Sequence, residues 1–256
     1  MRRLIFPAAA FACAAAFCWA EAWYLPAGIL AICAAMLLLL LRFEGKALRA
    51  EELVILAVMV ALAAVARVPF AAWPSVQPTS FVIIMAGAAF GAEAGVLVGC
   101  AAAFVSNLFL GQGPWTAWQM AAWGLMGLSA GLLRRILMKY APVRMLFGAI
   151  WGFLFGWIMN LWFVLSMGEA FTPTALIAAA AASASMDLAH AVCNAVLLGL
   201  FGGAWGKTLC RTAEKYALFC AARLRADAVS DTLSGGKELD MHGMDSGRDH
   251  DHARRD

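Results

Sequence analysis

The feature that most constrains this chain is a series of apolar runs, each close to the length that crosses a lipid bilayer. A helix needs about 20 mainly apolar residues to span a hydrocarbon core of roughly 30 Å. The chain has such runs at residues 4–20, 25–41, 51–66, 116–133, 145–167 and 183–206, and a longer run at 78–110 that we divide at Gly91-Ala92-Glu93. The pattern predicts an all-α, polytopic membrane protein with eight spans, two of them short.

Composition excludes several other classes of protein. Hydrophobic residues make up 64% of the 256 residues and charged residues 14%, whereas a soluble domain has about a quarter of its residues charged. The seven cysteines show no disulfide or metal-ligand spacing, so we interpret them as small residues of packed helices. Residues 202–208 resemble a phosphate-binding loop, but the spacing is one residue short and follows an apolar helix instead of a strand. This chain alone is therefore not expected to hydrolyse ATP.

The distribution of Lys and Arg predicts the orientation of the spans, because cytoplasmic loops carry an excess of these residues. One side of the eight-span arrangement collects Arg2, Arg3, Arg42, Lys46, Arg49, Arg134, Arg135, Lys139, Arg144, Lys207, Arg211 and Lys215. The opposite side has only Arg67. Both termini are therefore expected to be cytoplasmic, and segments 67–77, 111–115 and 168–182 to be external.

The two ends of the chain differ from its middle. Residues 1–49 are expected to form a transmembrane hairpin, although the first span can alternatively be a cleaved signal peptide. Residues 50–212 form the main membrane domain, and residues 213–256 a cytoplasmic end. Residues 207–225, which overlap both of these regions, have the pattern of a basic amphipathic helix at the inner leaflet, and the polar tail that follows is predicted to be disordered.

Polar side chains inside a membrane are costly and are therefore candidates for function. Asp187, His190 and Asn194 recur at i, i+3 and i+7, which places them on one helix face. Arg67, at the external end of its span, is the expected countercharge for Asp187. The alternative for each residue is a structural role in helix packing.

Further aromatic and amide residues are predicted at the same level of the membrane. They are Trp73, Gln77, Asn107, Gln112, Trp115, Gln119, Trp123 and Asn160. Together with Arg67, Asp187, His190 and Asn194, they predict the lining of an external pocket. Aromatic and amide groups suit a mostly neutral ligand that is bound by stacking and hydrogen bonds.

Several segments resemble a known family. They are R-x-P-F at 67–70, P-x-x-Q-P-T at 74–79, SNLFLGQGPWTAWQMAAWGLMG at 106–127 and MDLAHAVCNAVLLGLFG at 186–202. This combination resembles the substrate-specific (S) component of an energy-coupling factor (ECF) vitamin transporter, over residues 50–212. The GQGPW-bearing S components look most similar to those associated with cobalamin.

The resemblance implies a six-helix bundle in a prokaryotic inner membrane that captures a vitamin or related micronutrient from outside. It implies docking on a transmembrane coupling subunit through an AxxxA stripe, for which Ala57 and Ala61 stand at the matching positions. Two cytoplasmic ATPases would then drive uptake. No bound metal or other cofactor is expected, and the two N-terminal spans are additions to the six-helix pattern.

Two alternatives belong to other classes. An intramembrane enzyme would use His190 and Asp187 as an acid–base pair, but no nucleophile or metal set accompanies them. A self-sufficient secondary transporter is expected to contain inverted repeats with broken helices, and no internal repeat is visible. Both alternatives are weaker than the S component.

The predicted orientation can be tested by thiol labelling. We expect an impermeant thiol reagent to label single cysteines at Gln112 and Thr172 from outside intact cells, on a cysteine-free background, because both lie in segments predicted to be external. A cysteine at Lys139 should react only after the membrane is permeabilised. The reverse labelling pattern would contradict the external position of the pocket.

Overall fold

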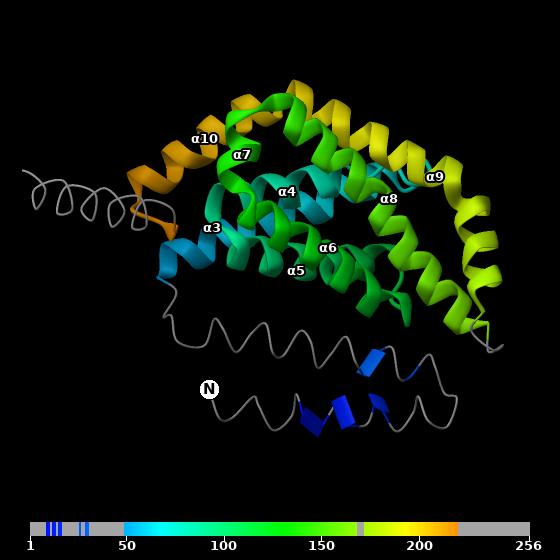
Figure 1. Cartoon of the computed structure of the whole chain (residues 1–256). Coiled ribbons are helices and arrows are strands. Elements are labelled where there is room, and N and C mark those ends of the chain that lie inside the picture. Colours follow the sequence, from blue (N-terminus) through cyan, green and yellow to red (C-terminus); the bar gives the residue numbers. More distant parts are fainter. Residues whose placement is uncertain are drawn as a thin grey trace, which may run out of the picture.

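The computed structural model describes residues 49–167 and 172–219, together with isolated positions between residues 9 and 30. The spans predicted at 4–20 and 25–41 and the tail from residue 220 lie outside the continuously described ranges. The described elements are α3 (Ala50–Arg67), η1 (Val68–Phe70), α4 (Pro78–Phe90), α5 (Ala92–Leu110), α6 (Trp115–Leu132), α7 (Arg134–Lys139), α8 (Ala141–Ser166), α9 (Pro173–Leu200) and α10 (Gly202–Lys215) (Figure 1).

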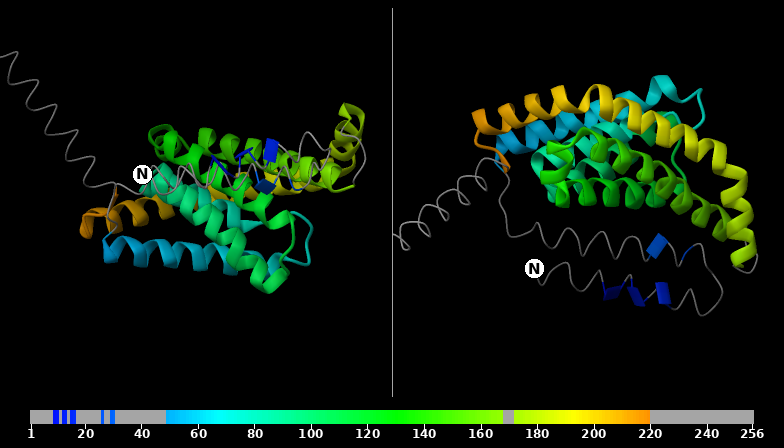
Figure 2. Two further views of the ribbon diagram at one scale, coloured as in Figure 1. Left: turned by 90° about the horizontal axis from the view of Figure 1, so that it is seen from below. Right: turned by 45° about the horizontal axis from the view of Figure 1, so that its top comes forward.

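The predicted all-α membrane bundle is confirmed, because every regular element in the described ranges is a helix. Helices α3, α4, α5, α6, α8 and α9 correspond to the six predicted core spans. Four segments are long and apolar enough to cross a membrane, namely Ala50–Phe70, Ala92–Leu110, Ala141–Ser166 and Pro173–Leu200, and α4 is a shorter apolar helix. Figures 1 and 2 show the joined ends of α8 and α9 projecting beyond the other described helices.

The boundaries predicted for the last span were wrong. Instead of residues 183–206, α9 covers Pro173–Leu200 and is followed after Phe201 by α10. Thr172 starts α9 early because its side-chain oxygen accepts a hydrogen bond from the backbone N–H of Ala175 at 3.2 Å, and proline fits the first turn of a helix. A basic amphipathic helix was predicted at residues 207–225, whereas α10 covers Gly202–Lys215 and therefore starts and ends earlier. It buries Leu209 and Ala213.

Helix α4 lies at the centre of the bundle. Its residues Thr79–Phe90 are all buried, and it contacts α3, α5, α6, α7, α8, α9 and α10. A helix that is apolar on every side is typical of such a central position. The two hydroxyls in its first turn are also buried, and Thr79 donates a hydrogen bond to the backbone oxygen of Ala63 in α3 at 2.8 Å.

Glycines set the distances between the central helices. Gly91 alone separates α4 from α5 and has φ of +104°, which L-residues with a Cβ rarely adopt. The predicted division of residues 78–110 at this position is therefore confirmed. Where α5 and α6 cross, a Cβ added to Gly127 would collide with the backbone carbonyl of Gly95. Small residues at such crossings allow close packing of helix backbones in lipid.

A buried arginine fastens the end of the bundle that is predicted to be cytoplasmic. Arg144, in the first turn of α8, is only 4% exposed. Its Nε donates a hydrogen bond to the carbonyl of Leu198 in α9 at 3.0 Å, and its Nη1 to the carbonyl of Leu137 in α7 at 2.9 Å. Both acceptors lie in the last turn of their helix, where carbonyls lack helical partners and the helix dipole favours a cation.

The α5–α6 crossing generates a stability prediction. Replacing Gly127 by Ala should lower stability by about 1–3 kcal/mol, because the crossing has no room for a methyl group. Gly203→Ala in α10 is the matched control, because an added Cβ there meets only the Nη2 of Arg144, at 3.9 Å. The control should be neutral or slightly stabilising. Thermal unfolding of both purified variants in one detergent would measure the difference, and equal melting temperatures would contradict it.

Candidate functional site

The first polar cluster lies where the C-terminal end of α3 meets α5 and α6. The Nη1 of Arg67 donates hydrogen bonds to Ser106 Oγ at 2.8 Å and to Asn107 Oδ1 at 2.6 Å. The amide nitrogen of Asn107 in turn donates to Thr116 Oγ1 at 2.9 Å and to Gln119 Oε1 at 2.8 Å. Ser106 and Asn107, which bind the guanidinium, are both neutral, so the cluster keeps the positive charge of Arg67.

A second cluster lies directly beside the first, around the N-terminal turn of α4. The guanidinium carbon of Arg67 is 5.0 Å from the ring centroid of Trp123, a cation–π geometry. The indole N–H of Trp123 donates to Ser80 Oγ at 3.0 Å, and the same oxygen is 2.7 Å from His190 Nε2. Phe155 contacts both rings, with its centroid 4.8 Å from Trp123 and 5.1 Å from His190. Ser80 of α4 therefore links Trp123 of α6 to His190 of α9.

A third cluster is confined to the contact between α8 and α9. Asn160 donates to Ser183 Oγ at 2.8 Å, and Ser183 donates to a carboxylate oxygen of Asp187 at 3.1 Å. The expected pairing of Asp187 with Arg67 is wrong, because Arg67 binds α5 side chains while Asp187 faces Gly156 of α8. Asn194 is also buried between these two helices, where it donates to the carbonyl of Gly148 at 3.0 Å.

The remaining predicted residues lie in or beside loops that are predicted to be external. Trp73 is 61% exposed and stacks only loosely on Phe70. Gln112, also exposed, donates to the carbonyl of Phe104 at 2.9 Å and accepts from Thr116 at the same distance. Trp115, at the start of α6, meets Trp162 of α8 edge to face, with ring centroids 5.9 Å apart. These residues, which we call the aromatic and amide rim, lie at the same ends of the helices as the first two clusters.

Four buried polar atoms have no hydrogen-bond partner among the described residues. They are Gln77 Oε1, which precedes α4, Asn194 Oδ1 of the third cluster, and the indole nitrogens of Trp118 and Trp162. Buried polar groups are normally paired, so each has capacity for one further hydrogen bond. Two of these atoms are acceptors and two are donors.

Sequence reasoning missed several residues of these clusters, namely Ser80, Ser106, Thr116, Phe155, Trp162 and Ser183. Most are hydroxyls within apolar runs, where Ser and Thr commonly bond to their own helix backbone. The only indication in the sequence was that Ser80 lies three residues after Gln77, next to the P-x-x-Q-P-T segment quoted above. That signal does not distinguish a backbone bond from a bond between helices.

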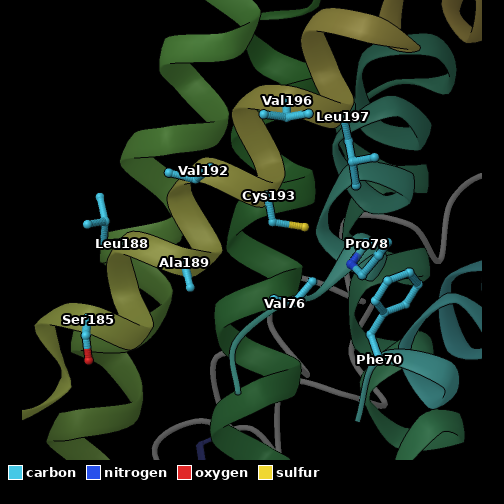
Figure 3. Close-up of a pocket in the computed structure, with 10 residues that line it drawn as sticks. All are labelled: Phe70, Val76, Pro78, Ser185, Leu188, Ala189, Val192, Cys193, Val196 and Leu197. Atoms are coloured by element: carbon cyan, nitrogen blue, oxygen red, sulfur yellow. The ribbon is translucent and has the colours of Figure 1, made fainter. Parts of the chain in front are cut away.

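An apolar cavity of about 590 Å³ lies beside the loop before α4 (Figure 3). Phe70, Val76 and Pro78 form one wall, and Cys193 and Leu197 of α9 face them. Its other lining residues are Ser185, Leu188, Ala189, Val192 and Val196. The cavity offers almost no hydrogen-bonding groups and lies on the side of α9 away from Asp187 and His190. The polar clusters and their rim therefore remain the better candidate for a vitamin site.

The predicted docking stripe is accessible. Ala57 and Ala61 are both exposed on α3, and their neighbours Val54 and Val58 are 63% and 46% exposed. The opposite face of α3 buries Leu56, Met59, Ala63 and Ala64 against the bundle. The described helices therefore leave this apolar face of α3 uncovered.

Comparison with known proteins gives one family. A family model described as ECF-type riboflavin transporter, S component, matches residues 47–206, which is more than half of the chain. No curated protein and no solved structure matches the chain. The match begins just before α3 and ends within α10, so it covers all six core helices and all three polar clusters. The chain therefore belongs to the ECF-type riboflavin transporter S component family, as a substrate-binding membrane subunit of a vitamin transporter and not an enzyme.

Proposed function

We propose that this S component captures cobalamin from outside a prokaryotic inner membrane, with both chain termini in the cytoplasm. The ligand would bind at the aromatic and amide rim and above Arg67. The protein would deliver it together with a transmembrane coupling subunit and two cytoplasmic ATPases. Family membership supports the vitamin and the partners in general terms, and the polar clusters support the position of the site.

The observation that carries this proposal is the environment of Arg67. Burial of a charged group is costly unless it is paired, yet its hydrogen-bond partners among the described residues are the hydroxyl of Ser106 and the amide of Asn107. The guanidinium lies at the end of α3 that leads into the first external loop. A ligand with one anionic group would provide the missing countercharge.

The chemistry of cobalamin matches these features. Its nucleotide loop carries a single phosphodiester, which guanidinium groups bind well. The edge of its corrin ring carries primary amides, which can both donate to Gln77 Oε1 and accept from the indole N–H of Trp162. Riboflavin, after which the family is described, is the second candidate. Its flat ring suits the pair of Trp115 and Trp162, but it has no anionic group for Arg67.

The docking proposal rests on the exposed stripe of α3. Alanines spaced by four residues allow another helix to approach closely in lipid, where packing drives association. Ala57 and Ala61 have this spacing, and their exposed neighbours are all apolar. The coupling subunit is the membrane partner that the family provides.

Ligand binding is tested by calorimetry on the purified protein, with cyanocobalamin and riboflavin titrated in parallel. Trp115→Ala and His190→Ala should each weaken binding about fivefold to a hundredfold, which corresponds to about 1–3 kcal/mol. Trp205→Ala is the control, because Trp205 lies in α10, outside the proposed pocket, and packs on Phe81. Equal affinity in all three folded variants would contradict the proposed position of the pocket. Binding of riboflavin but not of cyanocobalamin would contradict the proposed ligand and leave the position of the pocket unchanged.

Docking is tested by vitamin uptake in cells. The double variant Ala57→Leu with Ala61→Leu should abolish uptake, because leucine side chains hold the partner helix away, while the purified variant still binds ligand. Ala178→Leu with Ala182→Leu is a matched control, because these alanines are also exposed and four residues apart, but they lie in α9. Loss of ligand binding in the α3 variant would indicate a folding role instead.

A further inference from the structure

The residues that follow α10 are hydrogen-bonded to the N-terminal end of α3. The backbone N–H of Leu218 donates to the carbonyl of Ala213 at 2.8 Å, and Ala217 has φ of +50°, which is a Schellman-type end of a helix. Arg49 then donates to the carbonyl of Ala217 at 3.2 Å. Leu218 is only 1% exposed. We call residues 216–219 the α10 latch.

Glu52 completes this attachment with both of its carboxylate oxygens. One accepts from the backbone N–H of Arg49 at 3.1 Å and caps α3, and the other accepts from the backbone N–H of Phe219 at 3.2 Å. The ring of Phe219 packs on that of Phe90, with centroids 6.0 Å apart. The latch therefore joins α10 to both α3 and the end of α4.

A groove of about 390 Å³ runs between the base of α3 and the latch. Its lining residues are Ala50, Glu51, Val54, Ile55, Thr212, Tyr216 and Leu218. The floor is apolar, while Glu51 at the rim pairs with Arg49 at 3.4 Å. An apolar centre with a polar rim is the anatomy of protein–protein contacts. Because hydrogen bonds hold its walls, the groove is preformed, which lowers the entropic cost of binding.

The groove is continuous with the docking stripe. Val54 belongs to both, since it lines the groove and lies one turn before Ala57 and Val58 on the exposed face of α3. A helix that follows the stripe toward the predicted cytoplasmic end would reach the groove next. The other wall, formed by Thr212, Tyr216 and Leu218, lies outside the family match, which ends at residue 206.

We propose that the α3–α10 groove is a second docking site for the coupling subunit and receives apolar side chains from its cytoplasmic region. The proposal rests on the proposed function, because the stripe and the groove would contact the same partner. The groove would add contacts that select the partner at the membrane surface, where the stripe alone offers only small apolar side chains.

The test places a photo-crosslinking benzophenone side chain at single positions of the full-length protein, within the complete transporter in its native membrane. Tyr216 reports on the groove and Val58 on the stripe. Tyr140 is the matched control, because it is equally exposed, at 48% against 49% for Tyr216, and also has a lysine ammonium over its ring. Mass spectrometry of the crosslinked products identifies the partner.

We expect crosslinks to the coupling subunit from Tyr216 and Val58 and none from Tyr140. Crosslinking from Val58 alone would overturn the groove proposal and leave the docking stripe in place. Crosslinks from Tyr216 to the chain's own tail, to a second copy or to lipid would also overturn it, as would equal crosslinking from Tyr140. If neither Val58 nor Tyr216 crosslinks to the coupling subunit, the docking proposal is rejected as well. If Tyr216 alone crosslinks to it, the groove proposal is supported and the rest of the interface must lie away from the stripe.

Discussion

The complete enclosure of α4 by its neighbours is the constraint on which the rest of this structure depends. Seven helices pack against α4, which has only 13 residues. Such close approach requires glycines such as Gly87, because the position that a Cβ would take there is filled by the backbone of Gly127. Lipid tails are as apolar as leucine, so close packing and hydrogen bonds between helices supply the stability. Polar groups on α4 must therefore find partners on other helices. Ser80 does so with Trp123 and His190.

The polar residues in the half of the bundle that is predicted to be external serve two different purposes. Asn160, Ser183, Asp187 and Asn194 bond within the α8–α9 pair and hold two long helices in register. The bonds of Arg67, by contrast, link α3 to α5 and leave its charge without a counterion among the described residues. This difference separates the residues that hold the α8–α9 pair together from Arg67, whose charge is left for a ligand. Trp123 packs against the guanidinium, and Ser80 links Trp123 to His190 of α9.

Apolar length was enough to predict the helical class and the six core spans, because it follows from the cost of exposing backbone polar groups to lipid. The Gly91 division was also predictable, since few other residues join two helices so tightly. The partner of Arg67 was not, because depth in the membrane does not determine which helices touch. The start of α9 was missed because the alanine-rich segment before Asp187 carries a weak apolar signal, and its Thr-Pro start lies ten residues ahead of the predicted boundary.

The length of α9 determines how the bundle can sit in a bilayer. Its 28 residues rise about 42 Å at 1.5 Å per residue, which exceeds a hydrocarbon core of roughly 30 Å by about 12 Å. Absorbing this mismatch by tilt alone would need an inclination of about 45°, beyond the usual range for transmembrane helices. The first turns of α9, where no residue before Asp187 is buried, must therefore enter the headgroup layer. Membrane thickness would then act directly on the α8–α9 end of the bundle, so lipid composition becomes a variable that sets the position of this end relative to the membrane surface.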